Sequence, residues 1–227
     1  MNLTLPVILG ASVSLLGSMI IVLTIGWHGT ISLDSLSGPQ KVQRNAVPRI
    51  GGIAVFAGFW TAALTAPPTI RKYLLMMGAC GLLAFFAGLA EDFTKRVSGT
   101  VRMVATLISG LAFSIFSGYS VTRIDVQIID QHVLINPIIG IVFTAFAIAG
   151  IAHSINIIDG FNGLSAGGVI IMLSAFGVVA MRSGDRDLAS LAILIAAVLG
   201  GFLVVNFPHG RLIMGDGGAY VVGFLLA

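Results

Sequence analysis

The sequence predicts an all-α protein that crosses a membrane several times, and three observations support this prediction. Of the 227 residues, 57% are hydrophobic and only 9% are charged, and the mean hydropathy is +1.04. A soluble domain carries about a quarter charged residues, so this composition excludes one. Apolar runs of about 20 residues recur along the chain, and a helix of that length spans a bilayer. The alternating pattern of about ten residues that marks a membrane strand does not recur.

The apolar runs predict seven complete transmembrane helices and the start of an eighth. The complete helices are expected at about residues 5–27, 50–66, 73–90, 101–121, 138–155, 164–181 and 188–207. The last apolar run, 219–227, would cover only about 14 Å of a roughly 30 Å hydrocarbon core. Segment 122–136 alternates apolar and polar residues and is consistent with a small hairpin outside the bilayer. We interpret residues 1–227 as one integral-membrane domain.

The basic residues predict how this domain is oriented. Because helices alternate in direction, the loops after the first, third, fifth and seventh helices share one side. That side carries seven basic residues: Lys41, Arg44, Arg49, Lys95, Arg96, Arg102 and Arg211. The other side carries five: Arg71, Lys72, Arg123, Arg182 and Arg186. The positive-inside rule therefore places the first side in the cytoplasm and the N-terminus outside.

Three polar motifs lie at helix ends on the predicted cytoplasmic side. They are Glu91-Asp92 with Lys95 one helical turn later, the segment 156–164 that contains Asp159, and Met214–Gly218 around Asp216. Charged groups at the edge of the hydrocarbon are costly and mark a site by default. At Asp216, three glycines before a helix would direct backbone N–H groups at an anion. A carboxylate in this setting suits Mg²⁺, which binds carboxylates together with substrate phosphates.

Each motif also has a structural interpretation. Asp-Gly and Asn-Gly are turn dipeptides, and the glycines near Asp216 would also permit close helix packing. Taken alone, Glu91-Asp92 with Lys95 is better interpreted as an interfacial ion pair. Arg44 and Arg49 would either bind phosphate or anchor a helix end at the membrane surface. The four histidines, His153 among them, have no zinc-ligand spacing, and the net charge of +3 is too dispersed for a nucleic-acid surface.

Taken together, the motifs resemble those of the polyprenyl-phosphate N-acetylhexosamine-1-phosphate transferase family. The resemblance rests on four segments in the family's order: 48–52 (PRIGG), 91–95 (EDFTK), 156–164 (NIIDGFNGL) and 206–218. It implies that a lipid phosphate attacks the β-phosphorus of a UDP-sugar, which yields a polyprenyl-diphospho-sugar and UMP. The expected activity is that of a Mg²⁺-dependent phospho-N-acetylhexosamine transferase, with Mn²⁺ as the alternative cofactor.

The resemblance also implies roles for particular residues. The catalytic candidates are Glu91, Asp92 and Asp216, of which Asp216 and Asp92 would hold the metal. The substrate-binding candidates are Arg44, Lys95, Asn156, Asp159, Asn162 and Asn206. The expected partners are polyprenyl phosphate, a UDP-N-acetylhexosamine, the membrane and a second copy of the chain as a homodimer. The expected location is the bacterial inner membrane, with the site facing the cytoplasm.

The chain departs from the family pattern at several positions. The family usually has Asp where Glu91 stands, Asn where His153 stands and Asp where Asn162 stands. Glu91 favours the branch that initiates surface polysaccharides such as the O-antigen of lipopolysaccharide over the peptidoglycan enzyme. Family members also have about ten or eleven helices, so the chain is expected to lack the C-terminal third. Two other classes remain open: a secondary transporter, and an inactive fragment or non-catalytic membrane subunit.

Overall fold

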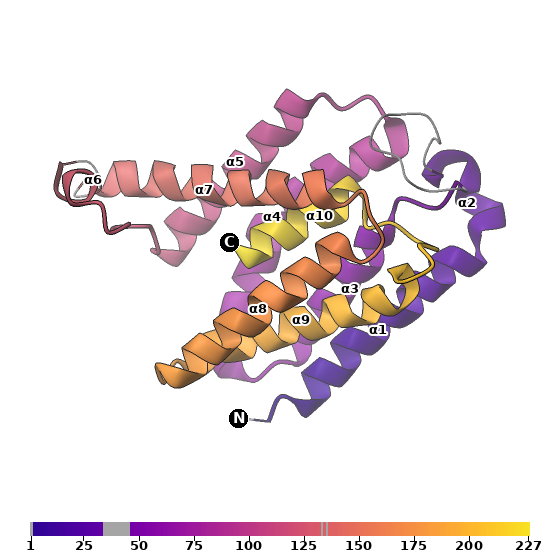
Figure 1. The fold of residues 1–227 in the computed structure, drawn as a ribbon, viewed down its shortest axis with the longest axis horizontal. Helices are drawn as coiled ribbons and strands as arrows, with labels where there is room; N and C mark the ends of the chain where they lie inside the picture. The colour runs from indigo at the N-terminus through magenta and orange to yellow at the C-terminus, as the bar shows by residue number, and fades with distance from the viewer. Residues whose placement is uncertain (1, 34–45, 133, 135) are drawn as a thin grey trace.

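The computed structural model describes residues 2–33, 46–132, 134 and 136–227, and these residues form an all-α bundle (Figure 1). Apart from one isolated antiparallel bridge between Leu33 and Pro48, the described residues contain no strand pairing. The helices are α1 (Thr4–Leu23), α2 (Ile25–Ser32), α3 (Gly51–Thr65), α4 (Pro68–Thr94), α5 (Gly99–Ser117), α6 (Gln127–His132), α7 (Pro137–Ile158), α8 (Leu164–Arg182), α9 (Arg186–Asn206) and α10 (Gly215–Leu226).

The helices have the length and surface of a membrane protein. Within the described residues, six helices are long and apolar enough to cross a bilayer: α1, α4, α5, α7, α8 and α9. The apolar helix α3 is shorter, with 15 residues. Large apolar side chains such as Phe116, Phe146 and Ile171 point outward and are more than half exposed. The predicted all-α membrane bundle is confirmed.

Two local predictions were wrong. The expected first helix, 5–27, is broken at Thr24, whose hydroxyl donates to the carbonyl oxygen of Ile20 at 2.7 Å. Such a bond favours a bend, and Gly26 two residues later weakens the helix further. The described residues of 122–136 form no hairpin; within them Gln127–His132 form the short helix α6, and the Asp130 carboxylate accepts the Ile124 N–H at 2.9 Å. Polar side chains that satisfy the local backbone replace the expected strand pairing.

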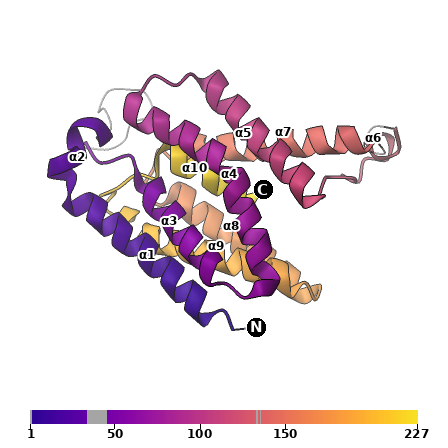
Figure 2. The ribbon, with the colours of Figure 1, turned by 180° about the vertical axis from the view of Figure 1, so that it is seen from behind.

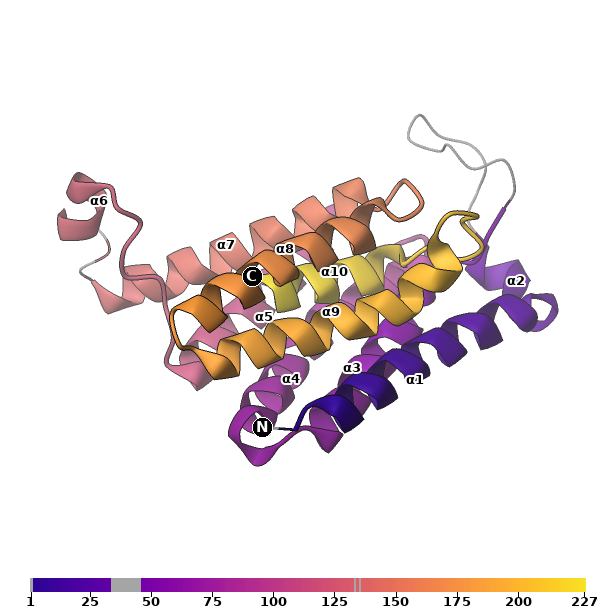
Figure 3. The same ribbon diagram turned by 60° about the horizontal axis from the view of Figure 1, so that its bottom comes forward.

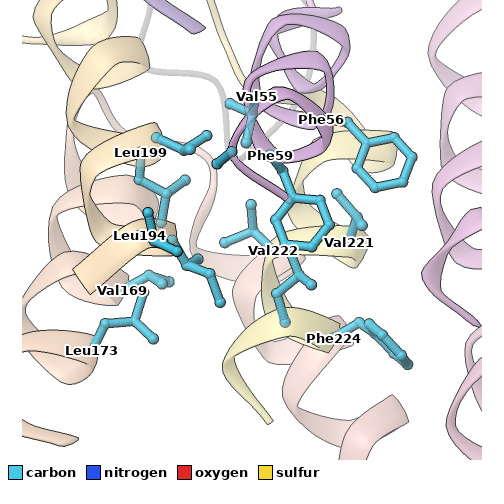
Figure 4. Packing of buried hydrophobic residues seen from close by; sticks show 14 of the residues in the cluster. Val55, Phe56, Phe59, Val169, Leu173, Leu194, Leu199, Val221, Val222 and Phe224 are labelled. Atoms are coloured by element: carbon cyan, nitrogen blue, oxygen red, sulfur yellow. The ribbon is translucent and has the colours of Figure 1, made fainter. Parts of the chain in front are cut away.

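Helix α10 lies at the centre of the bundle, packed against α4, α7 and α3 (Figures 2 and 3). All of its residues from Gly215 to Leu225 are buried. Its apolar side chains Val221, Val222 and Phe224 belong to one core cluster with Phe59 of α3 and Leu194 of α9 (Figure 4). A helix that is buried on every side exposes no polar face to water. The polar groups at its N-terminus must therefore find partners inside the protein.

Two glycines let the start of α10 enter this position. A Cβ atom on Gly52 of α3 would lie 2.3 Å from the backbone nitrogen of Gly218. A Cβ atom on Gly88 of α4 would lie 2.5 Å from the backbone nitrogen of Gly217. Both obstacles are backbone atoms, which cannot turn away as the end of a side chain can. The close approach of α3 and α4 to α10 therefore requires glycine at both positions.

This packing predicts that Gly88→Ala destabilises the protein, because the added methyl group must push α10 away from α4. Overpacking of this kind costs about 1–3 kcal/mol or more. The matched control is Gly150→Ala in α7, where a Cβ atom meets nothing within 4 Å. Thermal unfolding in detergent should show a clearly lower Tm for Gly88→Ala and an unchanged or slightly higher Tm for Gly150→Ala. Equal Tm values for the two variants would contradict the assigned contact.

Candidate functional site

The N-terminus of α10 is capped by carboxylates from two other parts of the chain. Asp92, near the end of α4, accepts the N–H groups of Asp216 at 2.8 Å and Gly217 at 2.9 Å. Asp159, which follows α7, accepts the N–H of Gly215 at 3.1 Å. The first N–H groups of a helix lack partners within the helix, and its dipole favours negative charge there. The sequence predicted an anion at this helix start, and the chain supplies two of its own.

The side chain of Asp216 lies in a buried network of charge. It is 1% exposed, and its carboxylate accepts hydrogen bonds from the guanidinium groups of Arg49 and Arg102. It also accepts one from Asn156 Nδ2 at 3.0 Å. A carboxylate taken out of water is tolerated when charged donors surround it in this way. Arg49, Arg102 and Asn156 come from three segments that are distant in sequence, and all three meet α10 at Asp216.

Arg49 links the two buried carboxylates of α4 and α10. Its Nε lies 3.3 Å from Asp92 Oδ1, while its Nη2 donates to Asp216. The backbone on either side of Arg49 is fixed against the segment that leads into α10. The carbonyl of Pro48 accepts the Ile213 N–H at 2.9 Å, and the Gly51 N–H donates to the Ile213 carbonyl at 2.9 Å. The PRIGG segment thus holds Arg49 in register with Asp216.

The remaining predicted acidic and basic candidates separate from this network. The carboxylate of Glu91 accepts the Val97 N–H at 2.7 Å and so closes the turn between α4 and α5. Lys95 Nζ donates to the Leu33 carbonyl at 3.1 Å, beyond the end of α2. Glu91 and Asp92 are neighbours in sequence but turn in different directions. Arg44 falls outside the described residues.

The two asparagine candidates Asn162 and Asn206 connect loops. Asn206 is buried, accepts the Gly163 N–H at 2.6 Å and donates to the Leu212 carbonyl at 2.7 Å. Asn162 Nδ2 donates to the Pro208 carbonyl at 3.2 Å. These bonds join the α7–α8 loop to the α9–α10 loop. The arrangement fixes the relative position of Asp159 and Asp216.

Sequence reasoning did not single out Arg102 or Tyr220 as site residues, and it left Arg49 with two interpretations. Arg102 lies in the first turn of the apolar helix α5, and a charged residue inside a membrane helix is itself a functional signal. Tyr220 is 1% exposed, and its ring centroid lies 6.0 Å from Arg102 Cζ. Its hydroxyl lies 3.5 Å from Asn156 Oδ1. Tyr220 gave no signal in the sequence because it lies within the apolar run 219–227.

The donor atoms of the network agree in part with the predicted metal site. Within the described residues, no three His, Cys, Asp or Glu side chains converge as a metal-binding group. Asp216 carries hard oxygen donors of the kind that Mg²⁺ prefers, whereas Asn156 turns its Nδ2 toward Asp216 and its Oδ1 toward the Tyr220 hydroxyl. The oxygens of both aspartates already accept hydrogen bonds: those of Asp92 from backbone N–H groups, and those of Asp216 from side chains, which can turn away when a metal binds. Asp216 therefore suits a metal better than Asp92 does.

An apolar cavity of about 510 Å³ lies away from these charges, at the other end of α10. Its walls include Tyr73, Phe113, Phe176 and Leu191, together with the last residues of α10. None of the residues of the Asp216 network contributes to its lining. The charged network, and not this cavity, is the candidate functional site.

Comparison with known proteins gives a family match for most of the chain. The model of glycosyl transferase family 4 matches residues 74–227. An undecaprenyl-phosphate alpha-N-acetylglucosaminyl 1-phosphate transferase of Yersinia pestis is 26% identical over 82% of the chain and 51% of its own length. A probable undecaprenyl-phosphate N-acetylglucosaminyl 1-phosphate transferase of Bacillus subtilis (strain 168) is 28% identical over 95% of the chain and 60% of its own length.

A second kind of relative is equally similar. A phospho-N-acetylmuramoyl-pentapeptide-transferase of Streptococcus pneumoniae (strain CGSP14) is 27% identical over 83% of the chain and 60% of its own length. The chain thus spans between about half and three-fifths of the length of these relatives. Because both kinds of transferase match to the same degree, the comparisons do not support the expected preference for O-antigen or lipopolysaccharide synthesis.

The protonation of Asp159 leads to a prediction about stability. Burial raises the pKa of Asp159 to about 7, although hydrogen bonds from Ser165 and the Gly215 N–H act to lower it. An acid whose pKa is higher in the folded state binds more protons when folded. Stability therefore falls as pH rises from about 4 to about 7 and stays at the lower level above that range.

We expect Asp159→Asn to remove this part of the pH dependence, because the amide oxygen still accepts one hydrogen bond and carries no charge. Unfolding of the wild type and the variant should be followed between pH 4 and pH 8. The Tm of Asp159→Asn minus the Tm of the wild type should increase as pH rises. A constant difference over the whole range would refute the prediction.

Proposed function

The chain belongs to glycosyl transferase family 4, and from this membership we propose that it forms the core of a membrane enzyme that transfers N-acetylhexosamine 1-phosphate to polyprenyl phosphate. In this reaction an oxygen of the lipid phosphate forms a bond to the β-phosphorus of a UDP-sugar. The bond between that phosphorus and the oxygen of UMP breaks. The products are a polyprenyl-diphospho-sugar and UMP, and no oxidant or reductant is needed. The names of the relatives support this acceptor and this transferred group.

One observation carries the proposal: the buried carboxylate of Asp216 and two partly exposed arginines are held together at the start of the central helix. Phosphoryl transfer needs positioning and charge neutralisation more than it needs a covalent contribution from the protein. Arg49 and Arg102 supply guanidinium groups that match phosphate oxygens in geometry and charge. In the proposed complex, they neutralise the diphosphate of the donor and the phosphate of the lipid.

The other network residues keep these groups in place. Asp92 holds the backbone of α10, and with it the Asp216 side chain, in one position. Asn156 orients the Asp216 carboxylate from α7. Preorganised charges of this kind stabilise the transition state because they do not have to reorient during the reaction. Glu91, Lys95 and Asn162 make none of the bonds of the network described above, and they remain candidates for contacts to substrate.

We propose Mg²⁺, or alternatively Mn²⁺, as the cofactor, with Asp216 as its protein ligand. In this proposal the Asn156 side-chain amide turns over so that its Oδ1 becomes the second oxygen donor, and the guanidinium groups turn from Asp216 to the substrate phosphates. When bound, the cation would neutralise charge on the diphosphate. Asp92 stays with the α10 backbone and holds the site together.

The acceptor in this proposal is a membrane lipid, which explains why a charged site stands at the end of apolar helices. Its phosphate would reach the network from the membrane surface while its hydrocarbon chain stays in the bilayer. We further propose that this end of the bundle faces the cytoplasm of a bacterium and that the membrane is the inner one. The distribution of basic residues supports this orientation. A homodimer remains part of the proposal.

The metal proposal predicts that Asp216→Asn in the full-length protein lowers Mg²⁺-dependent transfer by about a thousandfold or more, because the cation loses its charged ligand. The assay is release of UMP from a UDP-N-acetylhexosamine in the presence of polyprenyl phosphate. The matched control is Asp125→Asn, in an exposed turn between α5 and α6. Asp125→Asn should leave the rate unchanged. Near-normal turnover by Asp216→Asn would show that this carboxylate is structural.

The proposed orientation predicts which side of the membrane reaches each loop. A cysteine that replaces Phe161, which is 56% exposed, should react with an impermeant thiol reagent only from the cytoplasmic side. A cysteine that replaces Asp125 should react only from outside. Both substitutions need a background in which the native Cys80 is replaced by alanine. Labelling of position 161 in intact cells would reverse the assigned orientation.

A further inference from the structure

Unpaired polar atoms reveal a second feature beside Asp216. Among the buried side-chain nitrogen and oxygen atoms of the described residues, three have no hydrogen-bond partner: Ser14 Oγ, Arg102 Nε and His153 Nε2. A buried polar group without a partner loses the free energy of its bonds to water. Such groups are rare in native proteins, and each one calls for an explanation.

Two of these atoms border the same aromatic ring. The imidazole of His153 packs against Tyr220 with 4.7 Å between ring centroids. Arg102 Cζ lies 6.0 Å from the centroid of the same Tyr220 ring. The charges of Arg102 and Asp216 both act on His153. The unpaired atoms of α5 and α7 are therefore neighbours of one side chain of α10.

The network described above leaves both atoms unused. Arg102 holds Asp216 through Nη1, so Nε is a further N–H donor on the same guanidinium. His153 makes no contact with Asp216 and has no part in the capping of α10. A neutral imidazole carries one N–H, and in the tautomer with hydrogen on Nε2 this atom is a donor as well. Two donors beside a fixed cation suit an anionic oxygen, which accepts the strongest hydrogen bonds.

We infer that Arg102 Nε and His153 Nε2 together bind one anionic phosphate oxygen of the donor substrate. This inference rests on the proposed function, since it assumes that a diphosphate enters the site beside Asp216. It assigns His153 a direct role in substrate binding.

The test uses inorganic pyrophosphate as the probe and two substitutions of His153. His153→Phe keeps a ring against Tyr220 and removes the nitrogen donor. His153→Gln restores an N–H at about the distance of Nε2. Pyrophosphate affinity, measured by ³¹P NMR titration of the detergent-solubilised protein, should fall about tenfold or more in His153→Phe. His153→Gln should stay near the wild type, as should His209→Gln, a control at an exposed histidine of the α9–α10 loop.

A second readout separates binding from a purely structural role. In protein labelled with ¹⁵N-histidine, the Nε2 signal that disappears in His153→Gln should shift when pyrophosphate is added to the wild type. An unmoved signal, or a His153→Phe variant with wild-type affinity and Tm, would overturn the inference and leave water as the only partner. Binding through His153 without transfer to polyprenyl phosphate would contradict the proposed function alone. Transfer that His153→Phe leaves unchanged would contradict the inference alone.

Discussion

The structure depends on one constraint, which is that helix α10 starts inside the protein. Its first N–H groups cannot reach water, so Asp92 and Asp159 accept them. Each of these carboxylates needs a position at the end of its own helix, and this need fixes where α4 and α7 end relative to α10. The Asp216 side chain then needs charged donors, which Arg49 and Arg102 supply. The site and the fold are therefore one set of contacts.

This constraint also explains why the residues around the site are small. The backbone of α10 approaches α3 and α4 so closely that only glycine fits at positions 52 and 88. Close approach shortens the path from the Asp92 carboxylate to the Asp216 and Gly217 N–H groups. It also excludes water from the start of α10. Electrostatic interactions are stronger where water is excluded, so the same packing that holds the bundle raises the influence of each charge on a bound phosphate.

The sequence predicted the helices and the meeting of acidic motifs because both follow from strong constraints. Hydrocarbon requires long apolar helices, and charges at their ends on one side must lie near one another. The directions of individual side chains were beyond the sequence. Glu91 and Asp92 are adjacent, yet one closes a turn and the other caps α10, and this difference depends on where α10 lies. The break at Thr24 likewise could not be predicted from its hydroxyl, because Thr106 and Thr144 make the same bond to the preceding turn inside continuous helices.

The charges of the network explain why an anionic substrate would bind together with a cation. Asp92, Asp159 and Asp216 oppose the two guanidinium groups of Arg49 and Arg102. The two guanidinium charges therefore meet three carboxyl groups, and the network has no large excess of positive charge to offer an anion. A diphosphate would add two negative charges to this group. A divalent cation on Asp216 would compensate them, and this charge balance is the physical reason for expecting metal and substrate to enter together.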